Sequence, residues 1–164
     1  NVFRYFNAAG ASEKLGECHK HESHLIPIIC QVALGQKEKC QLYGNDYQTK
    51  DGTCIRDYIH VLDLANAHIL ALDNLDNHSS SKYNLGNGKG FSNLEVLKMV
   101  KKVSGKKIPF EIAHRRSGDP AVLIASSELV KSELGLKPQF TDLEIIVSTA
   151  WEWYKKHPRG YKIA

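Results

Sequence analysis

The sequence contains no apolar run that approaches the roughly 20 residues a membrane-spanning helix needs. No secretory signal pattern is present either, because Arg4, Glu13 and Lys14 interrupt the start of the chain. The four cysteines form no Cys-x-x-Cys pair, and Cys30 falls in a helical pattern. We therefore expect reduced thiols in a cytoplasmic protein, without contact to a membrane.

Several motifs of catalysis and nucleotide binding are also missing. The chain has no Gly-x-Gly-x-x-Gly loop, no Walker loop, no Gly-x-Ser-x-Gly elbow and no tyrosine followed four residues later by lysine. Gly86, Gly88 and Gly90 have the wrong spacing for a phosphate cradle, and Phe91-Ser92 begins an ordinary capped helix. The chain thus lacks a dinucleotide loop and a tyrosine–lysine base of its own.

The composition is that of a globular protein. The 164 residues are 42% hydrophobic and 24% charged, which suffices for one domain or for part of a larger one. A net charge of +4 suits an anionic small ligand but is too weak to argue for nucleic acid. Because Asn1 is followed at once by a strand pattern, we expect the chain to be a fragment or a processed product.

Strand and helix patterns alternate along the chain, which predicts an α/β fold. Alternating or short apolar runs predict strands at 2–7, 41–43, 55–61, 83–86 and 108–112. Helical periodicity predicts helices at 25–34, 64–75, 92–105, 126–135 and 141–157. Ser92 with Glu95, and Thr141 with Glu144, have the spacing of capping boxes, so we expect each pair to begin a helix.

The segment Cys18–His24 gathers several residues that could bind a metal. A zinc ion takes about four nitrogen or sulfur ligands. The spacing fits no standard zinc finger, and no second cluster supplies the remaining ligands. We therefore predict a polar loop and no metal site.

Three features suit an anionic ligand. A helix that begins near His24-Leu25 presents free backbone N–H groups. Arg56 lies in a strand that is otherwise apolar and aromatic. It is either a clamp for a phosphate or one half of a structural ion pair, and Asp57 of a neighbouring element is a candidate partner for that pair. The third feature is the loop 115–120, where adjacent side chains point apart, so only Arg115 or Arg116 can face a given ligand. A salt-bridged surface loop is the alternative.

The order of these motifs resembles the UDP-glucose 4-epimerases, which are extended members of the short-chain dehydrogenase/reductase superfamily. The resemblance covers essentially the whole chain, and its most specific part is Asp51–Val61. The matching segments are Arg4–Asn7, His24–Pro27, Leu42–Tyr47, Asp51–Val61, Tyr83–Gly86, Arg115–Asp119, Trp151–Trp153 and His157-Pro158.

The resemblance implies a binding site assembled from separate segments. It places Phe6 against the nicotinamide end of NAD and Asn7 on the substrate diphosphate or sugar, and it gives His24 and Leu25 a role at the helix start. It assigns Gln41, Leu42 and Tyr43 to the uracil, with the aromatic ring stacked on the base. It assigns Arg56 and Arg116 to the diphosphate and Asp119 to the ribose hydroxyls. The size of the side chain at Leu123 helps decide whether N-acetylated sugars fit.

The resemblance also implies a reaction. NAD oxidises C4 of the hexose, the 4-keto sugar rotates, and the hydride returns to its other face, which interconverts UDP-glucose and UDP-galactose. The family's catalytic tyrosine, lysine and serine have no counterparts here, so we expect no catalytic residues in residues 1–164. We predict a carboxyl-terminal part: a small substrate-binding domain plus edge strands of an incomplete Rossmann-like parallel sheet. An absent amino-terminal half would bind most of the NAD.

Other readings remain open from the sequence. Another nucleotide-sugar epimerase or dehydratase would share most of these motifs, and a non-catalytic module could bind UDP-sugars without NAD. The sequence is silent on the oligomeric state, and a homodimer of the whole enzyme is one expectation. Leu123 is intermediate in size, so it does not decide whether N-acetylated sugars fit.

Overall fold

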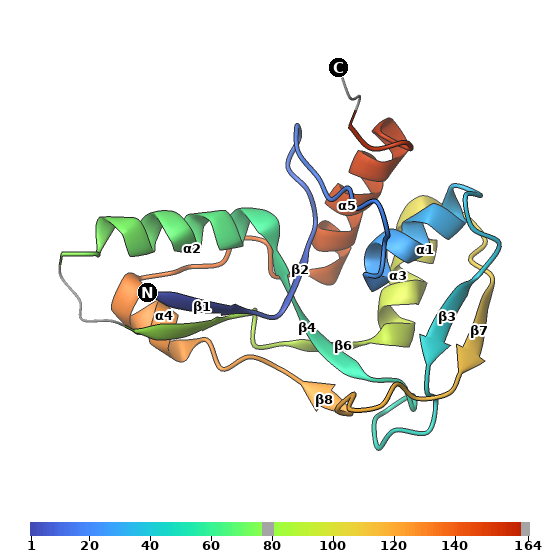
Figure 1. Cartoon of the computed structure of the whole chain (residues 1–164), viewed down its shortest axis with the longest axis horizontal. Coiled ribbons are helices and arrows are strands. Elements are labelled where there is room, and N and C mark those ends of the chain that lie inside the picture. The colour runs from blue at the N-terminus through green and yellow to red at the C-terminus, as the bar shows by residue number, and fades with distance from the viewer. Residues whose placement is uncertain (77–80, 162–164) are drawn as a thin grey trace.

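The structure is a computed structural model that describes residues 1–76 and 81–161. Two groups of helices lie on either side of a central sheet (Figure 1). In this sheet β4 (Ile55–His60) pairs in parallel with β2 (Asn7–Ala9) and antiparallel with β6 (Gly90–Ser92). The short strand β8 (Val122–Leu123) also pairs with β4, in parallel. The central sheet therefore joins the two halves of the molecule.

The larger half, which we call the large lobe, contains three helices packed on one another. These are α1 (Leu25–Ala33), α3 (Asn93–Ser104) and α5 (Leu143–Lys156). A parallel pair of strands, β3 (Cys40–Tyr43) and β7 (Phe110–Ala113), flanks them. Their buried side chains, together with Ala9 of β2, Ala11 just after it and Tyr58 of β4, form most of the larger hydrophobic core.

The smaller half, the small lobe, is built on a two-stranded parallel sheet. In it β1 (Val2–Tyr5) pairs with β5 (Lys82–Leu85), and helices α2 (Val61–Asp73) and α4 (Glu128–Leu134) pack beside the strands. A second, smaller core fills this lobe. The parallel strands and the covering helices confirm the predicted α/β class. No helix in the described ranges is long and apolar enough to cross a membrane.

The helix predictions agree with the structure best where local signals are strong. The Ser92–Glu95 capping box is present, and α3 ends at Gly105 in the left-handed conformation. The second capping box was wrongly placed by one residue. Asp142, and not Thr141, is the N-cap of α5, and its carboxylate accepts a hydrogen bond from the Glu144 amide at 2.7 Å.

The strand predicted at 2–7 is two strands in two different sheets. The amide of Phe6 still donates to the carbonyl of Leu85, at 3.0 Å, but Asn7 pairs with Tyr58 of β4. The chain therefore leaves the small lobe at Phe6 and enters the central sheet. The strands β6 and β8 were missed, since segments of three and two residues carry too little pattern.

Candidate functional site

A cleft of about 560 Å³ opens on the large lobe, beside the start of α1, the strand β3 and the loop that follows β7. It collects most of the side chains predicted to bind a ligand, although they come from segments far apart in the sequence. The predicted residues that line it are Asn7, His24, Leu25, Gln41, Tyr43, Arg56, Arg116 and Asp119.

The start of α1 faces this cleft, and Glu22 accepts hydrogen bonds from the Ser23 and His24 amides just before the helix. His24 is the N-cap residue, its side chain makes no capping hydrogen bond, and the first turn contains no acidic residue. Pro27 in that turn has no N–H to satisfy, and Leu25 lines the cleft. The free amides and the helix dipole therefore favour an anion here, as the sequence predicts.

Arg56 is held at the bottom of the cleft by the loop after β7. Its Nη1 donates to the carbonyl oxygens of Ile55 and Pro120, both at 2.8 Å, and its Nη2 lies 3.3 Å from Oδ1 of Asp119. The Arg56 side chain is only 13% exposed. The guanidinium is thus fixed in direction, which is what a clamp for a phosphate or carboxylate needs.

The ion pair suggested between Arg56 and Asp57 is wrong. The two residues are neighbours on β4, so their side chains point to opposite faces. The Asp57 carboxylate accepts hydrogen bonds from the amides of Asn87, Gly88 and Ala125, at 2.8, 2.9 and 3.1 Å. These bonds also occupy the glycine-rich turn, so a carboxylate of the chain itself fills the place that a phosphate cradle would need.

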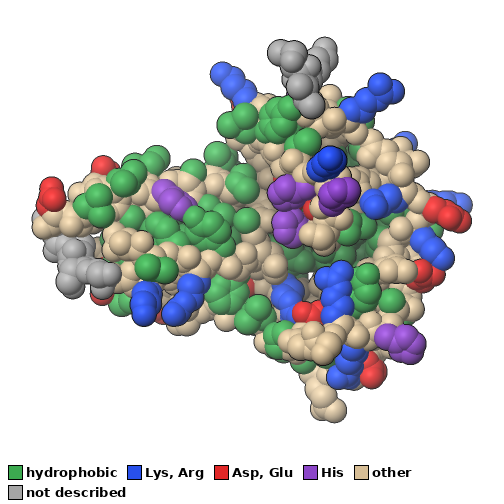
Figure 2. All heavy atoms as spheres, in the orientation of Figure 1, with side chains coloured by type: hydrophobic (Ala, Val, Ile, Leu, Met, Phe, Trp, Pro, Cys, Tyr) green, Lys and Arg blue, Asp and Glu red, His purple; other side chains and the backbone are tan. Residues whose placement is uncertain are grey.

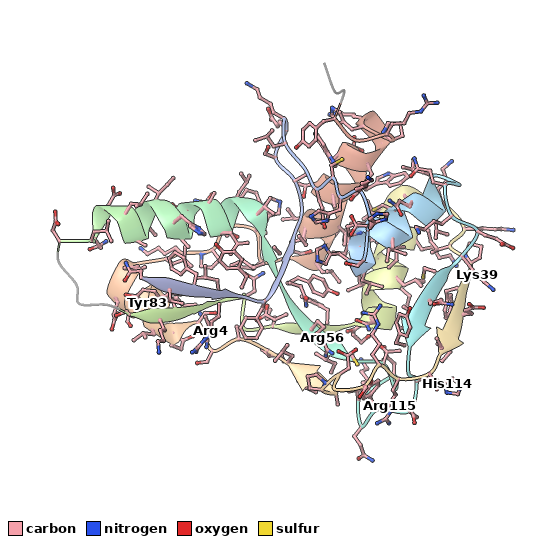
Figure 3. All side chains as sticks on the ribbon, viewed as in Figure 1. Arg4, Lys39, Arg56, Tyr83, His114 and Arg115 are labelled. Atoms are coloured by element: carbon pink, nitrogen blue, oxygen red, sulfur yellow. The ribbon has the colours of Figure 1, made fainter. Side chains whose placement is uncertain are left out.

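The two adjacent arginines point apart, as predicted. The Arg116 guanidinium lies over the Tyr43 ring, 3.9 Å from its centroid, and lines the cleft. Arg115 lies instead over the Tyr47 ring and donates from Nε to Oδ1 of Asp46 at 2.7 Å. This hydrogen bond and the positive charge lower the pKa of Asp46. In Figure 3, Arg115 lies by the end of β7, and Arg4 lies by β1 in the other lobe.

A row of polar side chains runs along β3 and β7 at the rim of the cleft. The Tyr43 hydroxyl donates to Oε1 of Gln41 at 3.0 Å, and the Gln41 amide donates to Glu111 at 2.8 Å. Lys39 donates to the other oxygen of Glu111 at 2.6 Å. The bond from Lys39, followed by that from Gln41, lowers the pKa of Glu111. The row holds Tyr43 and Gln41 in place.

Phe6 lies outside this cleft, on a neighbouring cavity of about 290 Å³. Asn7, His24 and Leu25 line both spaces, so the two share a wall. Tyr58 also lines both, and burial raises its pKa above the ordinary tyrosine value. A ligand that fills the cleft could therefore extend toward Phe6.

Two predicted residues do not line either space. The Leu42 side chain is 1% exposed in the large core, so only its backbone could meet a ligand. Leu123 is 45% exposed on β8, where it pairs with Arg56 of β4. Leu123 is therefore the neighbour of a cleft residue in the sheet, but its own side chain does not line the cleft.

The sequence reasoning missed several lining residues, notably Lys37, Lys39, Asn93 and Glu111. Lys39 could have been found, because it continues the alternation of Gln41 and Tyr43 on one face of the strand. Glu111 could not, because its place opposite Gln41 depends on the pairing of β3 with β7.

Comparison with known proteins shows which family the chain resembles in sequence. Residues 1–86 match the model of the NAD dependent epimerase/dehydratase family. A UDP-glucose 4-epimerase of Halalkalibacterium halodurans is 59% identical over 161 residues, and one of Streptococcus mutans is 54% identical over 161 residues. Each match covers 96% of this chain and 48% of the relative. The chain therefore spans about half the length of these curated relatives.

Solved structures show the same similarity. A UDP-glucose 4-epimerase from Bifidobacterium longum, in complex with NAD⁺ and UDP, superimposes with a TM-score of 0.92 at 41% identity. The match covers 97% of this chain and 48% of that one. The family match extends over more than half of the 164 residues, and the fold agrees with it. The chain belongs to the NAD dependent epimerase/dehydratase family.

Proposed function

We propose that the chain is the carboxyl-terminal, UDP-sugar-binding part of an NAD-dependent UDP-glucose 4-epimerase, and that the cleft holds the UDP moiety. The main support is one observation: Arg56, Arg116, Tyr43 and the start of α1 all line the same cleft. Three of these are cationic or carry partial positive charge, and the fourth is an aromatic ring. This combination matches the chemistry of a nucleoside diphosphate.

The diphosphate would lie between the two arginines and the first turn of α1. Arg56 already has both Nη atoms oriented by the loop after β7. Charge-assisted hydrogen bonds of this kind are shorter and roughly twice as strong as neutral ones. Lys37 and Lys39 at the rim add to the positive potential that attracts the anion.

The nucleoside would lie along β3. Base–aromatic stacking contributes roughly 1–3 kcal/mol, and Tyr43 supplies the ring. One face of that ring is covered by Arg116, so the base must use the other face or displace the guanidinium toward the phosphates. Asp119 pairs with Arg56 through Oδ1, which leaves its second oxygen for ribose hydroxyls.

The proposed reaction interconverts UDP-glucose and UDP-galactose through a 4-keto sugar, and NAD supplies the hydride acceptor. Rotation of the sugar requires a firmly held nucleotide and a loosely held hexose. The cleft supplies the first, and the adjoining cavity beside Phe6 offers space for the second. Phe6 gives that cavity an aromatic wall for the nicotinamide end of NAD. The chain has no glycine-rich dinucleotide loop, so we propose that most NAD contacts come from residues outside it.

Calorimetric titration of the chain with UDP tests the binding site. Arg116→Ala should weaken UDP binding by about 10- to 100-fold, because it removes charge-assisted bonds to a phosphate. Arg115→Ala is the matched control, since this neighbouring arginine pairs with Asp46 instead, and it should change the affinity less than about 2-fold. If the folded wild-type chain binds no UDP, or if both variants lose affinity equally, the proposed site is wrong.

An activity assay tests the second part of the proposal. The chain with added NAD should not interconvert UDP-galactose and UDP-glucose, because the tyrosine–lysine base of the family has no counterpart in its sequence. Clear turnover by the chain alone would refute the assignment to a non-catalytic part. Turnover by a longer natural protein that contains this sequence, lost with Arg116→Ala, would support the proposed function.

A further inference from the structure

Two histidines and two glutamates meet in the loop before α1. The ligand atoms of Glu17, His19, Glu22 and His24 all lie within 4.8 Å of one another. Figure 2 shows histidine side chains gathered on this face, over the loop between β2 and α1. From this geometry we infer a binding site for one divalent transition-metal ion, with Zn²⁺ as the ion that the ligands suit best. The inference does not depend on the proposed function.

Three of the distances between the ligand side chains lie close to those around a tetrahedral zinc ion, and the four ligand atoms lie within 4.8 Å of one another. Zinc bonds of about 2.0–2.1 Å to nitrogen and oxygen place neighbouring ligand atoms about 3.3–3.4 Å apart. His19 Nδ1 lies 3.1 Å from Oε1 of Glu17 and 3.6 Å from Oε2 of Glu22, and His24 Nδ1 lies 3.5 Å from Oε1 of Glu22. The contact between His24 and Glu17 is shorter than the others, so these two side chains must separate slightly to admit the ion.

One carboxylate of the cluster is already fixed in direction. Glu22 is only 4% exposed, and its Oε1 accepts hydrogen bonds from the amides of Ser23 and His24, both at 2.8 Å. Hydrogen bonds of this kind orient the ligands of metal sites. The imidazoles of His19 and His24 are 52% and 60% exposed, so the site has an open entry path.

The charge of the cluster also favours a cation. With neutral imidazoles the two carboxylates carry a charge of −2, and a divalent ion would cancel it. Their field reaches the protein interior: burial first, and then Glu17, raises the pKa of Cys30 to about 12. Burial followed by Glu17 and Glu22 raises the pKa of Tyr154 as well.

A buried hydroxyl that lines the same cavity as part of the cluster lacks a hydrogen-bond partner. Tyr154, Glu17 and His24 line the same cavity, and the Tyr154 hydroxyl makes no hydrogen bond within the part of the chain that the structure describes. A buried donor without a partner is costly. A water molecule that binds the ion as a fifth ligand would be able to accept this bond.

The prediction of no metal site rested on sequence spacing in Cys18–His24. It counted Cys18, but Glu17, which lies just outside that segment, supplies the fourth ligand in its place. The two reasons given, a non-standard spacing and the lack of a second cluster, do not exclude a site whose ligands all come from one folded loop. We therefore replace that prediction with the inference that this loop binds one ion.

The test uses the untagged chain with ZnCl₂, followed by calorimetry and thermal unfolding. We expect one ion per chain, and at Zn²⁺ about 100 times above Kd a rise in Tm of about 5–10 °C. Glu17→Gln and His19→Gln, both at exposed or partly exposed positions, should each abolish the rise. His21→Gln is the matched control, because this exposed histidine of the same loop lies outside the cluster, and it should keep the rise.

Three results would overturn the inference. They are the absence of stoichiometric binding by the wild-type chain, equal loss of binding in His21→Gln, and loss of binding in Cys18→Ser with retention in Glu17→Gln. Circular dichroism of each variant checks the fold. The visible absorption of bound Co²⁺ would separate a site with nitrogen and oxygen ligands from one that includes the Cys18 thiolate, which is a readout that a purely structural role of Glu17 would not change.

Discussion

The two lobes differ most in the outer faces of their helices. In the large lobe the solvent side of α3 carries Lys98, Lys101 and Lys102, while Val96 and Val100 are fully buried. In the small lobe, on and just after α2, large apolar side chains face outward: Leu62, Ile69, Leu72 and Leu75, with exposures of 39, 57, 65 and 54%. Figure 2 shows hydrophobic side chains spread over this lobe.

The difference indicates which lobe leaves less apolar surface on the outer faces of its helices. The large lobe covers its core with amphipathic helices and carries the ligand cleft, so its residues can hold the site in place. The small lobe has a two-stranded sheet, a smaller core and an apolar face of the kind that other protein segments cover. This agrees with our proposal that the chain is one part of an epimerase.

The strongest test deletes one buried side chain from each core. Ile146 in α5 is 0% exposed and Leu134 in α4 is 3% exposed, so either change to alanine should cost about 2–5 kcal/mol in the free energy of unfolding. Hydrogen exchange should show where the cost appears. Leu134→Ala should speed exchange in α2, α4, β1 and β5, while Ile146→Ala should speed it in α1, α3 and α5.

This pair of variants can also break the comparison. If either substitution raises exchange uniformly over both lobes, the chain unfolds as one cooperative unit and the lobes are not separate. If the small lobe exchanges as slowly as the large lobe in the wild-type chain, its exposed apolar face does not weaken it.

The sequence predicts those parts of the molecule that local signals determine. The capping box at Ser92 and the glycine at 105 define α3, because both ends depend on residues within one turn. Alternation along an extended segment predicts that Arg115 and Arg116 point apart, whereas the choice of Arg116 for the ligand came from the family resemblance. These predictions needed no knowledge of the fold.

The remainder depends on contacts between distant segments. One apolar run became β1 and β2 because Asn7 pairs with β4, and nothing within residues 2–7 marks that change of sheet. Likewise the partner of Asp57 lies in two loops about 30 and 68 positions away, so a neighbouring arginine seemed the better partner. The metal-type cluster needed the loop to fold back on itself before Glu17 could join it.

A second test removes the charge that ties the central sheet to the small lobe. Asp57 is fully buried, and its carboxylate accepts the three amide hydrogen bonds from Asn87, Gly88 and Ala125. Asp57→Asn keeps the size but places an amide N–H₂ group against these donors, so we expect a loss of about 2–3 kcal/mol, measured by urea unfolding. Asp73→Asn, at an exposed position near the end of α2, should change stability by less than about 0.5 kcal/mol.

A result for Asp57→Asn no larger than that for Asp73→Asn would mean that the three amides find other partners. The two loops would then not depend on β4 for their position. Asp57 would then not be the residue that connects the two lobes, although it lies where β4 passes from the cleft to the small lobe.

The smallest expected effect concerns His60, which connects the lobes at the end of β4. Its Nδ1 accepts a hydrogen bond from the Leu62 amide at 3.1 Å and so caps α2. The proton of the neutral ring is therefore on Nε2, which donates to Thr149 Oγ1 of α5 at 3.0 Å. The ring is 0% exposed, and burial lowers its pKa below the ordinary value of 6.5, although Asp63 acts in the opposite direction. Because the unfolded chain binds the proton more readily, His60 should leave stability unaffected above about pH 6.5 and reduce it as the pH falls through the lowered pKa.

His60→Asn can still cap α2 but cannot bind a proton in this range, so its free energy of unfolding should fall less between pH 7 and pH 5 than that of the wild-type chain. His114→Asn, at an exposed histidine after β7, should retain the wild-type pH dependence. Urea unfolding at both pH values would measure the difference. An identical pH dependence in His60→Asn and the wild-type chain would show that protonation at this junction costs nothing.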